Sequence, residues 1–577
     1  MSPPTLDQFL GEIAGIIKEK NGTQLQEYLI YEPPLPPLYN KIVSEIKQFY
    51  PTNSQKALEN KCISFIPEYD EGDDGGSRTS FVMFMVKYFT FLRDVNVDNL
   101  IETHDLLKAL LNQSILALSS SIGVIVLPTV VSLSHTLARL AIGLDKRPEL
   151  IEHLIKRESV VENEATERVT LVESSANVIR EAFKKCLSER SGPPSGVDSN
   201  GKPEGRRVGI YLMANLCLKL FFHCRKLRSA EQIFGNIYQQ SPPLGLFPAA
   251  QRVTFLYYLG RYLFANNHFY RAQLALQTAY DQCHAQCISQ RRLIFIYLTT
   301  SNIILGRFPS SRLLQRPEAA GLAEKFQPIC AAIAKGDLAS FRKYMDLDAQ
   351  HAEWFLQKRI LLQLSNRCEV LVWRSLARRT FTLSGSQGAV TSQGDVTRKA
   401  APTLSLQDML TLATLLEKRV LGFAEDTPKS NGLTNGHTGT QRTHTNAIFV
   451  FPKAQTPPPQ EADAELPYSY VDPDLADVVD PEPPLLPNME IIESIVASLI
   501  EQGLLHGFIS HAQHRFAITG VKDARPVQVG FPRVWDVIKA RANKEVPGWV
   551  KERKAPAFGP GMVVNLSGAR PAGAAPG

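Results

Sequence analysis

Cysteine is scarce in this chain, which has eight cysteines among 577 residues. That number is too small for a disulfide framework in a protein of this length. The first residues, MSPPTLDQFLGEI, lack the basic and apolar regions of a secretory signal peptide. We therefore expect reduced thiols in the cytosol or nucleus, and we exclude the secreted, disulfide-rich and collagen-like classes of protein.

Catalytic motifs are missing as well. The sequence has no phosphate-binding glycine loop, no GxSxG elbow and no HExxH pair. Cys283, His284 and Cys287 have a spacing that could place two thiols on one helix face. A structural zinc site needs four ligands, and no second pair follows at a suitable spacing. The sequence predicts no enzyme activity, no metal and no cofactor.

Charge is absent from residues 109–138, which include the apolar run IGVIVLPTVVSL. A membrane-spanning helix needs about 20 predominantly apolar residues. This stretch, however, also contains several serines, Asn112, Gln113 and Pro128. The serine run before Gly123 favours a break between two buried helices, and we expect no membrane insertion.

Basic and acidic residues alternate along the last third of the chain. Residues 358–399 hold eight basic and two acidic residues, and residues 454–514 hold eleven acidic residues without Lys or Arg. From Arg515 to the end there are eleven basic and four acidic residues. This pattern indicates binding partners and not an active site.

Helical periodicity dominates the first 383 residues. Residues 1–205 predict an N-terminal helical region, and residues 206–383 predict paired helices of a repeat. In LYYLGRYLFANNHFYRAQLALQTAY, small residues stand where two helices of a tetratricopeptide-like pair approach, with Asn266 and Asn267 in the turn. No regular 34-residue period follows. The fold class is therefore all-α, an irregular helical-repeat solenoid.

A C-terminal module completes the predicted organisation. Helical patterns at 404–421 and 489–505 precede a short hairpin signal, GFISHAQHRFAIT. This order is that of a winged helix, which we place at residues 384–422 and 488–520. Residues 423–487 are Pro-rich and finally acidic and predict a disordered insert. Residues 521–577 form a basic C-terminal extension.

The order of these features resembles the PCI-domain family. The similarity rests on YYLGRYLFANNHFYRAQLAL, RRLIFIYLTTSNIILGRFPS and EQGLLHGFISHAQHRFAIT, with a Gly336-Asp337-Leu338 step and Phe341 between them. Within the family it is similar to the branch of PCI domain-containing protein 2. That branch includes the PCI subunit of a nuclear mRNA-export complex and a signalosome-associated homologue.

The resemblance implies a non-catalytic scaffold subunit of a transcription-coupled mRNA-export complex. It further implies pairing with a larger PCI subunit, binding of a small acidic disordered subunit, and RNA or DNA binding on a winged-helix platform. The implied location is the nucleus, at nuclear pores, with some cytoplasmic protein. A signalosome-type or proteasome-lid-type subunit that acts in protein turnover without nucleic-acid binding remains the alternative.

Ten residues are candidate nucleic-acid contacts. They are basic residues of the helix that leads into the module, of the wing tip and of the extension: Lys358, Arg359, Arg367, Arg374, Arg378, Arg379, His511, His514, Arg515 and Lys522. Arg367, Arg374 and Arg378 share one face at helical spacing, as phosphate contacts would. Arg525 and Arg533 would extend this surface. A solvated helix face, pairing with a partner's carboxylates and a polar hairpin turn remain alternatives.

Overall fold

A computed structural model gives the fold of the chain. The structure describes residues 3–66, 76–120, 122–147, 149, 170–189, 197–198, 201–388, 390–393, 396–420, 488–521 and 525–541. They form two compact units, which divide between Val372 and Trp373. The division falls within one helix, α19 (Leu361–Ser384). We describe each unit by itself.

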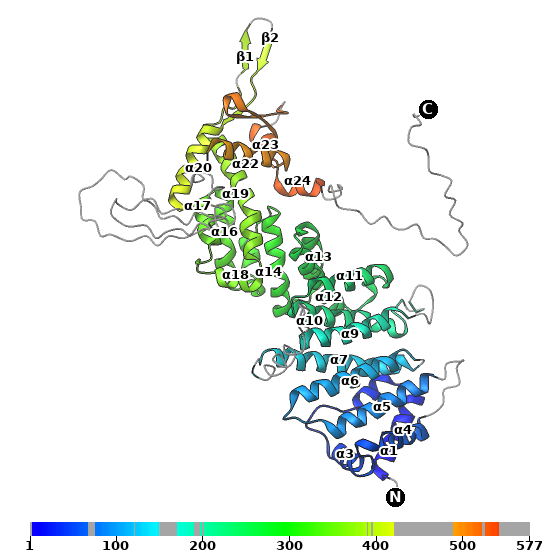
Figure 1. Ribbon diagram of the computed structural model, residues 1–577. Helices are drawn as coiled ribbons and strands as arrows, with labels where there is room; N and C mark the ends of the chain where they lie inside the picture. Colours follow the sequence, from blue (N-terminus) through cyan, green and yellow to red (C-terminus); the bar gives the residue numbers. More distant parts are fainter. Residues whose placement is uncertain are drawn as a thin grey trace, which may run out of the picture. The chain divides into compact units, whose positions relative to one another are not determined.

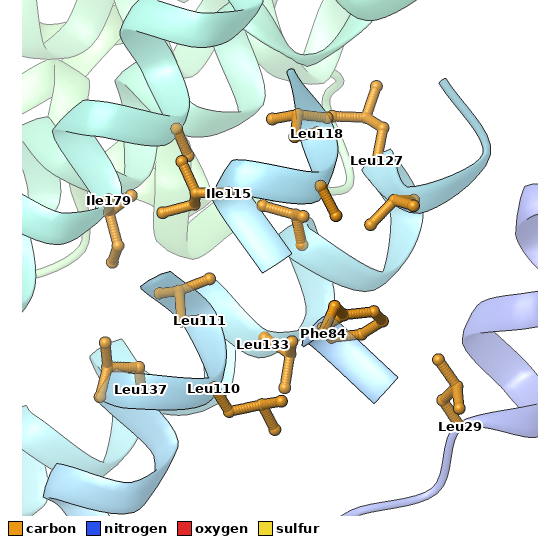
Figure 2. Packing of buried hydrophobic residues seen from close by; sticks show 14 of the residues in the cluster. Leu29, Phe84, Leu110, Leu111, Ile115, Leu118, Leu127, Leu133, Leu137 and Ile179 are labelled. Atoms are coloured by element: carbon orange, nitrogen blue, oxygen red, sulfur yellow. The ribbon is translucent and has the colours of Figure 1, made fainter. Parts of the chain in front are cut away.

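The larger unit begins with the helices drawn in blue and cyan in Figure 1. They bury one continuous apolar core. They are α1 (Pro4–Lys18), α2 (Gly22–Tyr28), α3 (Pro37–Phe49), α4 (Gln55–Phe65), α5 (Gly76–Asp94), α6 (Leu100–Leu118), α7 (Gly123–Asp145) and α9 (Leu171–Leu187), with a 3-10 turn η1 (Thr52–Ser54). Figure 2 shows Leu110 and Leu111 of α6 near Leu133 and Leu137 of α7. Apolar residues at helical spacing build this core, as the periodicity predicts.

Helix α7 occupies the uncharged stretch that raised the question of a membrane. It is the one described helix long and apolar enough to span a bilayer, and 56% of its most apolar window is buried inside the structure. It packs against α2, α6, α9 and α10. The predicted break lies between Leu118 and Gly123, where α6 ends and α7 begins. These contacts favour a core helix.

The repeat region follows in the same unit. Its helices are α10 (Ile210–His223), α11 (Leu227–Gln240), α12 (Ala249–Ala265), α13 (Phe269–Gln282), α14 (Ile288–Ile304), α15 (Ser311–Leu314), α16 (Ala323–Lys335), α17 (Leu338–Met345) and α18 (Ala352–Lys358), with 3-10 turns η2 (Gly205–Gly209), η3 (Leu244–Leu246) and η4 (Pro317–Ala319). Helices α10 to α14 each pack on the next helix in the chain, and α16 packs on α17. The prediction of an all-α solenoid is confirmed.

The tetratricopeptide-like pair owes its close packing to one glycine. A Cβ atom on Gly260 of α12 would lie 2.5 Å from Cγ of Leu276 on α13. Asn267 has a φ of 62° in the turn between the two helices, a conformation that asparagine tolerates. The small residue at this crossing therefore allows the contact, as the sequence indicates.

The Gly-Asp step also has a local physical cause. Gly336 ends α16 in the left-handed conformation with a φ of 68°. Asp337 then caps α17, because its carboxylate accepts a hydrogen bond from the backbone N–H of Ser340 at 3.0 Å. Leu338 and Phe341 of α17 are fully buried. The step thus joins a helix stop to a helix start.

The smaller unit contains the end of α19 and the C-terminal elements. These are β1 (Val390–Gln393), β2 (Val396–Lys399), β3 (Thr403–Ser405), α20 (Leu406–Val420), α22 (Met489–Glu501), β4 (Gly507–Ser510), η6 (His511–Gln513), β5 (Arg515–Ile518), α23 (Pro526–Gly530) and α24 (Val534–Arg541). Strands β4 and β5 form the predicted hairpin, and β3 pairs with β5 to give the antiparallel order β3-β5-β4. Two helices with a small sheet is the arrangement expected of a winged helix.

Two parts of this unit differ from the sequence prediction. The polar residues after Leu383 include the antiparallel hairpin β1–β2, which the sequence pattern did not predict. The predicted helix from Leu404 begins at Leu406, since Thr403–Ser405 pairs with β5. Polar strands give no apolar alternation, so periodicity does not reveal them.

Candidate nucleic-acid interface

The basic residues before the winged module lie on two helices. Helix α18 ends at Lys358, and Arg359 follows in the left-handed conformation with a φ of 56°. The carbonyl of Lys358 accepts a hydrogen bond from the hydroxyl of Tyr297 at 3.1 Å. Lys358 and Arg359 therefore do not share the face of Arg367, Arg374 and Arg378 on α19, which corrects the prediction of one basic helix.

Arg367 projects from the part of α19 that belongs to the larger unit, and it is exposed. Glu369 is the only acidic residue in α19. Its carboxylate accepts a hydrogen bond from Arg342 of α17 at 2.7 Å. The acidic charge nearest in sequence to Arg367 is thus already balanced by another arginine.

Arg374 is turned into the smaller unit. Its guanidinium donates to the carbonyls of Phe531 and Pro532 at 3.1 and 2.6 Å. Burial, with a contribution from Arg378, lowers the pKa of Arg374 to about 10. The expectation that Arg374 faces a phosphate together with Arg367 and Arg378 is therefore not met in this structure.

Arg378 and Arg379 lie one turn further along α19 and are exposed. On the wing, Arg515 is exposed at the start of the central strand β5, opposite Ser405 and Ser510. These exposed arginines can bind phosphate oxygens without any rearrangement of the core.

A carboxylate occupies the wing tip, where the sequence predicted only basic groups. Glu493 of α22 bonds to Nδ1 of His511 and of His514, each at 2.8 Å. These two contacts, of which the one with His514 has the larger effect, hold the pKa of Glu493 below its ordinary value. The sequence showed no sign of this pairing, because Glu493 lies 18 residues before His511 and in another element.

The first part of the C-terminal extension is integral to the module. Phe531 lies between Phe381 and Phe516, with ring centroids 5.7 and 6.5 Å apart. The carbonyl of Gly530 accepts a hydrogen bond from the backbone N–H of His506 at 3.0 Å. The basic composition of this segment predicts a separate extension. Phe531 is the one aromatic residue in the segment that is buried, and it is the sequence feature that could have indicated packing against the winged helix.

The other predicted residues lie in or beside the C-terminal segment, or in the repeat region. Lys522 and the predicted insert at 423–487 lie outside the described residues. Arg525 and Arg533 are exposed, beside α23 and α24. In the parts of the chain that the structure covers, no group of three His, Cys, Asp or Glu side chains could hold a metal ion. Cys283 is buried and Cys287 is exposed.

Comparison with known proteins gives relatives of one kind. No protein-family model matches the chain. A PCI domain-containing protein of Schizosaccharomyces pombe is 27% identical over 67% of this chain and 81% of its own length. A protein named CSN12 homolog from Neurospora crassa is 29% identical over 40% of this chain and 48% of its own length. PCI domain-containing protein 2 of Danio rerio is 25% identical over 37% of this chain and 49% of its own length. The chain thus matches about half the length of the last two relatives.

Proposed function

Since these relatives confirm the resemblance to the branch of PCI domain-containing protein 2, we propose that the chain is a non-catalytic scaffold subunit of a transcription-coupled nuclear mRNA-export complex. The relatives support a PCI scaffold. The partners in this proposal are a larger PCI subunit and a small acidic disordered protein, and the location is the nucleus, at nuclear pores. Helical repeats followed by a sheet-bearing module suit the binding of other chains.

Nucleic-acid binding is the finer part of the proposal, and the exposed arginines of α19 carry it. Arg367 in the larger unit and Arg378 in the smaller unit are each exposed, and the only carboxylate of α19 is held by Arg342. Arg515 adds a third exposed guanidinium on the wing. Such contacts bind phosphates with strong salt dependence and little sequence preference.

The test compares the full chain with the double variant Arg367→Glu and Arg378→Glu. Binding to single-stranded RNA and to duplex DNA is measured at 50 and 200 mM salt. The wild type should bind with a steep salt slope, and the variant should lose about one unit of that slope for each lost phosphate contact. A matched control, Lys47→Glu with Arg312→Glu, makes the same charge change at exposed positions elsewhere in the larger unit.

Equal loss in the control would show that net charge alone causes the binding. No binding by the wild type would remove the nucleic-acid role. The relatives named CSN12 homolog favour the second candidate, a signalosome-type or proteasome-lid-type scaffold in protein turnover. That candidate requires no nucleic-acid binding at all.

A further inference from the structure

Arg261 of the repeat region lies on an aromatic floor, and the charge of Arg359 interacts with those of Arg261 and Arg225. Arg261 of α12 lies 4.9 Å from the ring centres of both Phe222 and Tyr297, and 5.5 Å from that of Tyr257. Phe222 belongs to α10, three residues before Arg225. Tyr297 of α14 bonds through its hydroxyl to the carbonyl of Lys358, the residue before Arg359. Helix α12 packs against α10 and against α14.

Within the described chain, none of these three arginines has a carboxylate partner. Arg261 has aromatic rings and the Tyr257 hydroxyl, at 3.4 Å, around its guanidinium. Arg225 and Arg359 are exposed and have no side-chain hydrogen bond or ion pair to any described residue. Partial desolvation and then the like charges of Arg225 and Arg261 lower the pKa of Arg359. Arg359 therefore lies near like charges without a carboxylate partner among the described residues.

The backbone adds an independent observation. Arg225 follows the end of α10 with a φ of 64°, and Arg359 ends α18 with a φ of 56°. Glycine or asparagine suits such left-handed positions at a helix end, because an L side chain is strained there. Arginine is therefore unfavourable at both positions on conformational and on electrostatic grounds. Residues that break local rules without a gain in stability are expected where a ligand binds.

We infer that Arg225, Arg261 and Arg359 form a binding site for a phosphomonoester dianion. Guanidinium groups match phosphate oxygens in geometry, and a dianion balances a triple positive charge better than one carboxylate does. Phe222 and Tyr297, which flank Arg261, lie three residues before Arg225 and against the residue before Arg359, so the three arginines belong to one neighbourhood, which suits a compact anion. The aromatic floor restricts the motion of Arg261 and so prepares it for binding. This site does not depend on the nucleic-acid role, which is tested at Arg367 and Arg378.

Calorimetry on the full chain tests the site with three probes at constant ionic strength. The first is inorganic phosphate, the second a neutral peptide with one phosphoserine, and the third an oligonucleotide without a terminal phosphate. Binding of inorganic phosphate indicates a small-molecule source, and stronger binding of the phosphopeptide indicates a modified protein. Saturable binding of either should weaken at least tenfold in the double variant Arg225→Gln and Arg359→Gln. The control Lys47→Gln with Arg312→Gln should bind within twofold of the wild type.

The double variant Arg225→Gly with Arg359→Gly provides a second test, in which thermal stability is measured without and with phosphate. Without phosphate it should melt at a higher temperature than the wild type, because glycine relieves the left-handed strain. With phosphate, only the wild type should gain further stability. The proposal is overturned if neither phosphomonoester binds, if the glutamine variant binds as tightly as wild type, or if only the oligonucleotide depends on these arginines. A lower melting temperature of the glycine variant without phosphate would overturn it too, since contacts within the chain would then explain the arginines.

Discussion

A buried histidine shows how a single side chain can have a role that its residue type does not predict. His104 of α6 is fully buried, and its Nε2 lies 2.9 Å from the hydroxyl of Ser175 on α9. That hydroxyl already donates to the carbonyl of Leu171, so the imidazole Nε2–H is the donor in the contact. Burial lowers the pKa of His104, and the carboxylate of Asp105, 3.3 Å from Nδ1, partly opposes this shift.

This histidine should make the larger unit sensitive to acid. The unfolded chain takes up a proton near the ordinary pKa of 6.5, and the folded chain does so only at lower pH. The free energy of unfolding should therefore fall as pH drops below about 6.5, with His104 contributing up to about 1.4 kcal/mol per pH unit. Denaturant unfolding at several pH values should show a shallower slope for His104→Gln. An unchanged slope would assign the acid sensitivity to other groups, such as His135, whose pKa burial also lowers.

Arg374 should act in folding and not in phosphate binding. Replacement by alanine leaves two carbonyls, of Phe531 and Pro532, without their donor, which should lower the free energy of unfolding by about 1–3 kcal/mol. The exposed neighbour Arg378→Ala should change it by no more than about 0.5 kcal/mol. Chemical denaturation of both variants compares them. Equal stability of the two would contradict the structural role of Arg374.

The spacing of the sequence predicts the position of Arg374 around its helix, but it does not show which other segment packs against this side chain. The covering carbonyls come from residues 157 and 158 positions further along the chain. The pairing of Glu493 with two histidines escaped prediction for the same reason. Periodicity describes one element at a time, and both of these contacts join separate elements.

At the scale of elements, close helix packing depends on where a glycine stands. Gly260 and Gly235 are both inside helices, α12 and α11. A Cβ at Gly260 would collide with Leu276, and a Cβ at Gly235 would meet nothing within 4 Å. The same change to alanine should therefore have opposite effects at the two positions.

Gly235→Ala should stabilise the protein by up to about 1 kcal/mol through helix propensity. Gly260→Ala gains the same helix propensity, but its added methyl group collides with Leu276 where α12 and α13 cross. The free energy of unfolding should therefore fall by about 1–2 kcal/mol. Thermal and denaturant unfolding measure both. The further change Leu276→Ala should cost less in the Gly260→Ala background than in wild type. A stabilised Gly260→Ala variant would contradict the packing of α12 on α13.

The elements that the sequence predicted well are long and amphipathic. The helical character of the first 383 residues was predicted, because apolar periodicity persists over several turns of helices such as α6, α7, α12 and α13. The short polar strands β1, β2 and β3 lack that signal and were missed. Helices α23 and α24 were missed because the basic composition of their segment outweighed one buried aromatic residue, Phe531.

At the scale of the whole molecule, the chain has the architecture of a scaffold. A continuous apolar core supports the N-terminal helices, helices α10 to α14 each pack on the next, and a small sheet organises the second unit. Exposed arginines are distributed over both units, on α19 and on the wing. The PCI-named relatives make partner chains the first expectation, and the resemblance does not by itself separate mRNA export from protein turnover.

Quantitative mass spectrometry of complexes purified through the tagged full chain tests the central claim most directly. The account expects a larger PCI subunit and a small acidic protein in amounts close to that of the bait, together with nuclear-pore and RNA-export proteins. Treatment with nuclease should leave the protein partners bound. Recovery of signalosome or proteasome-lid subunits in such amounts, without RNA-export proteins, would contradict the account and favour the alternative.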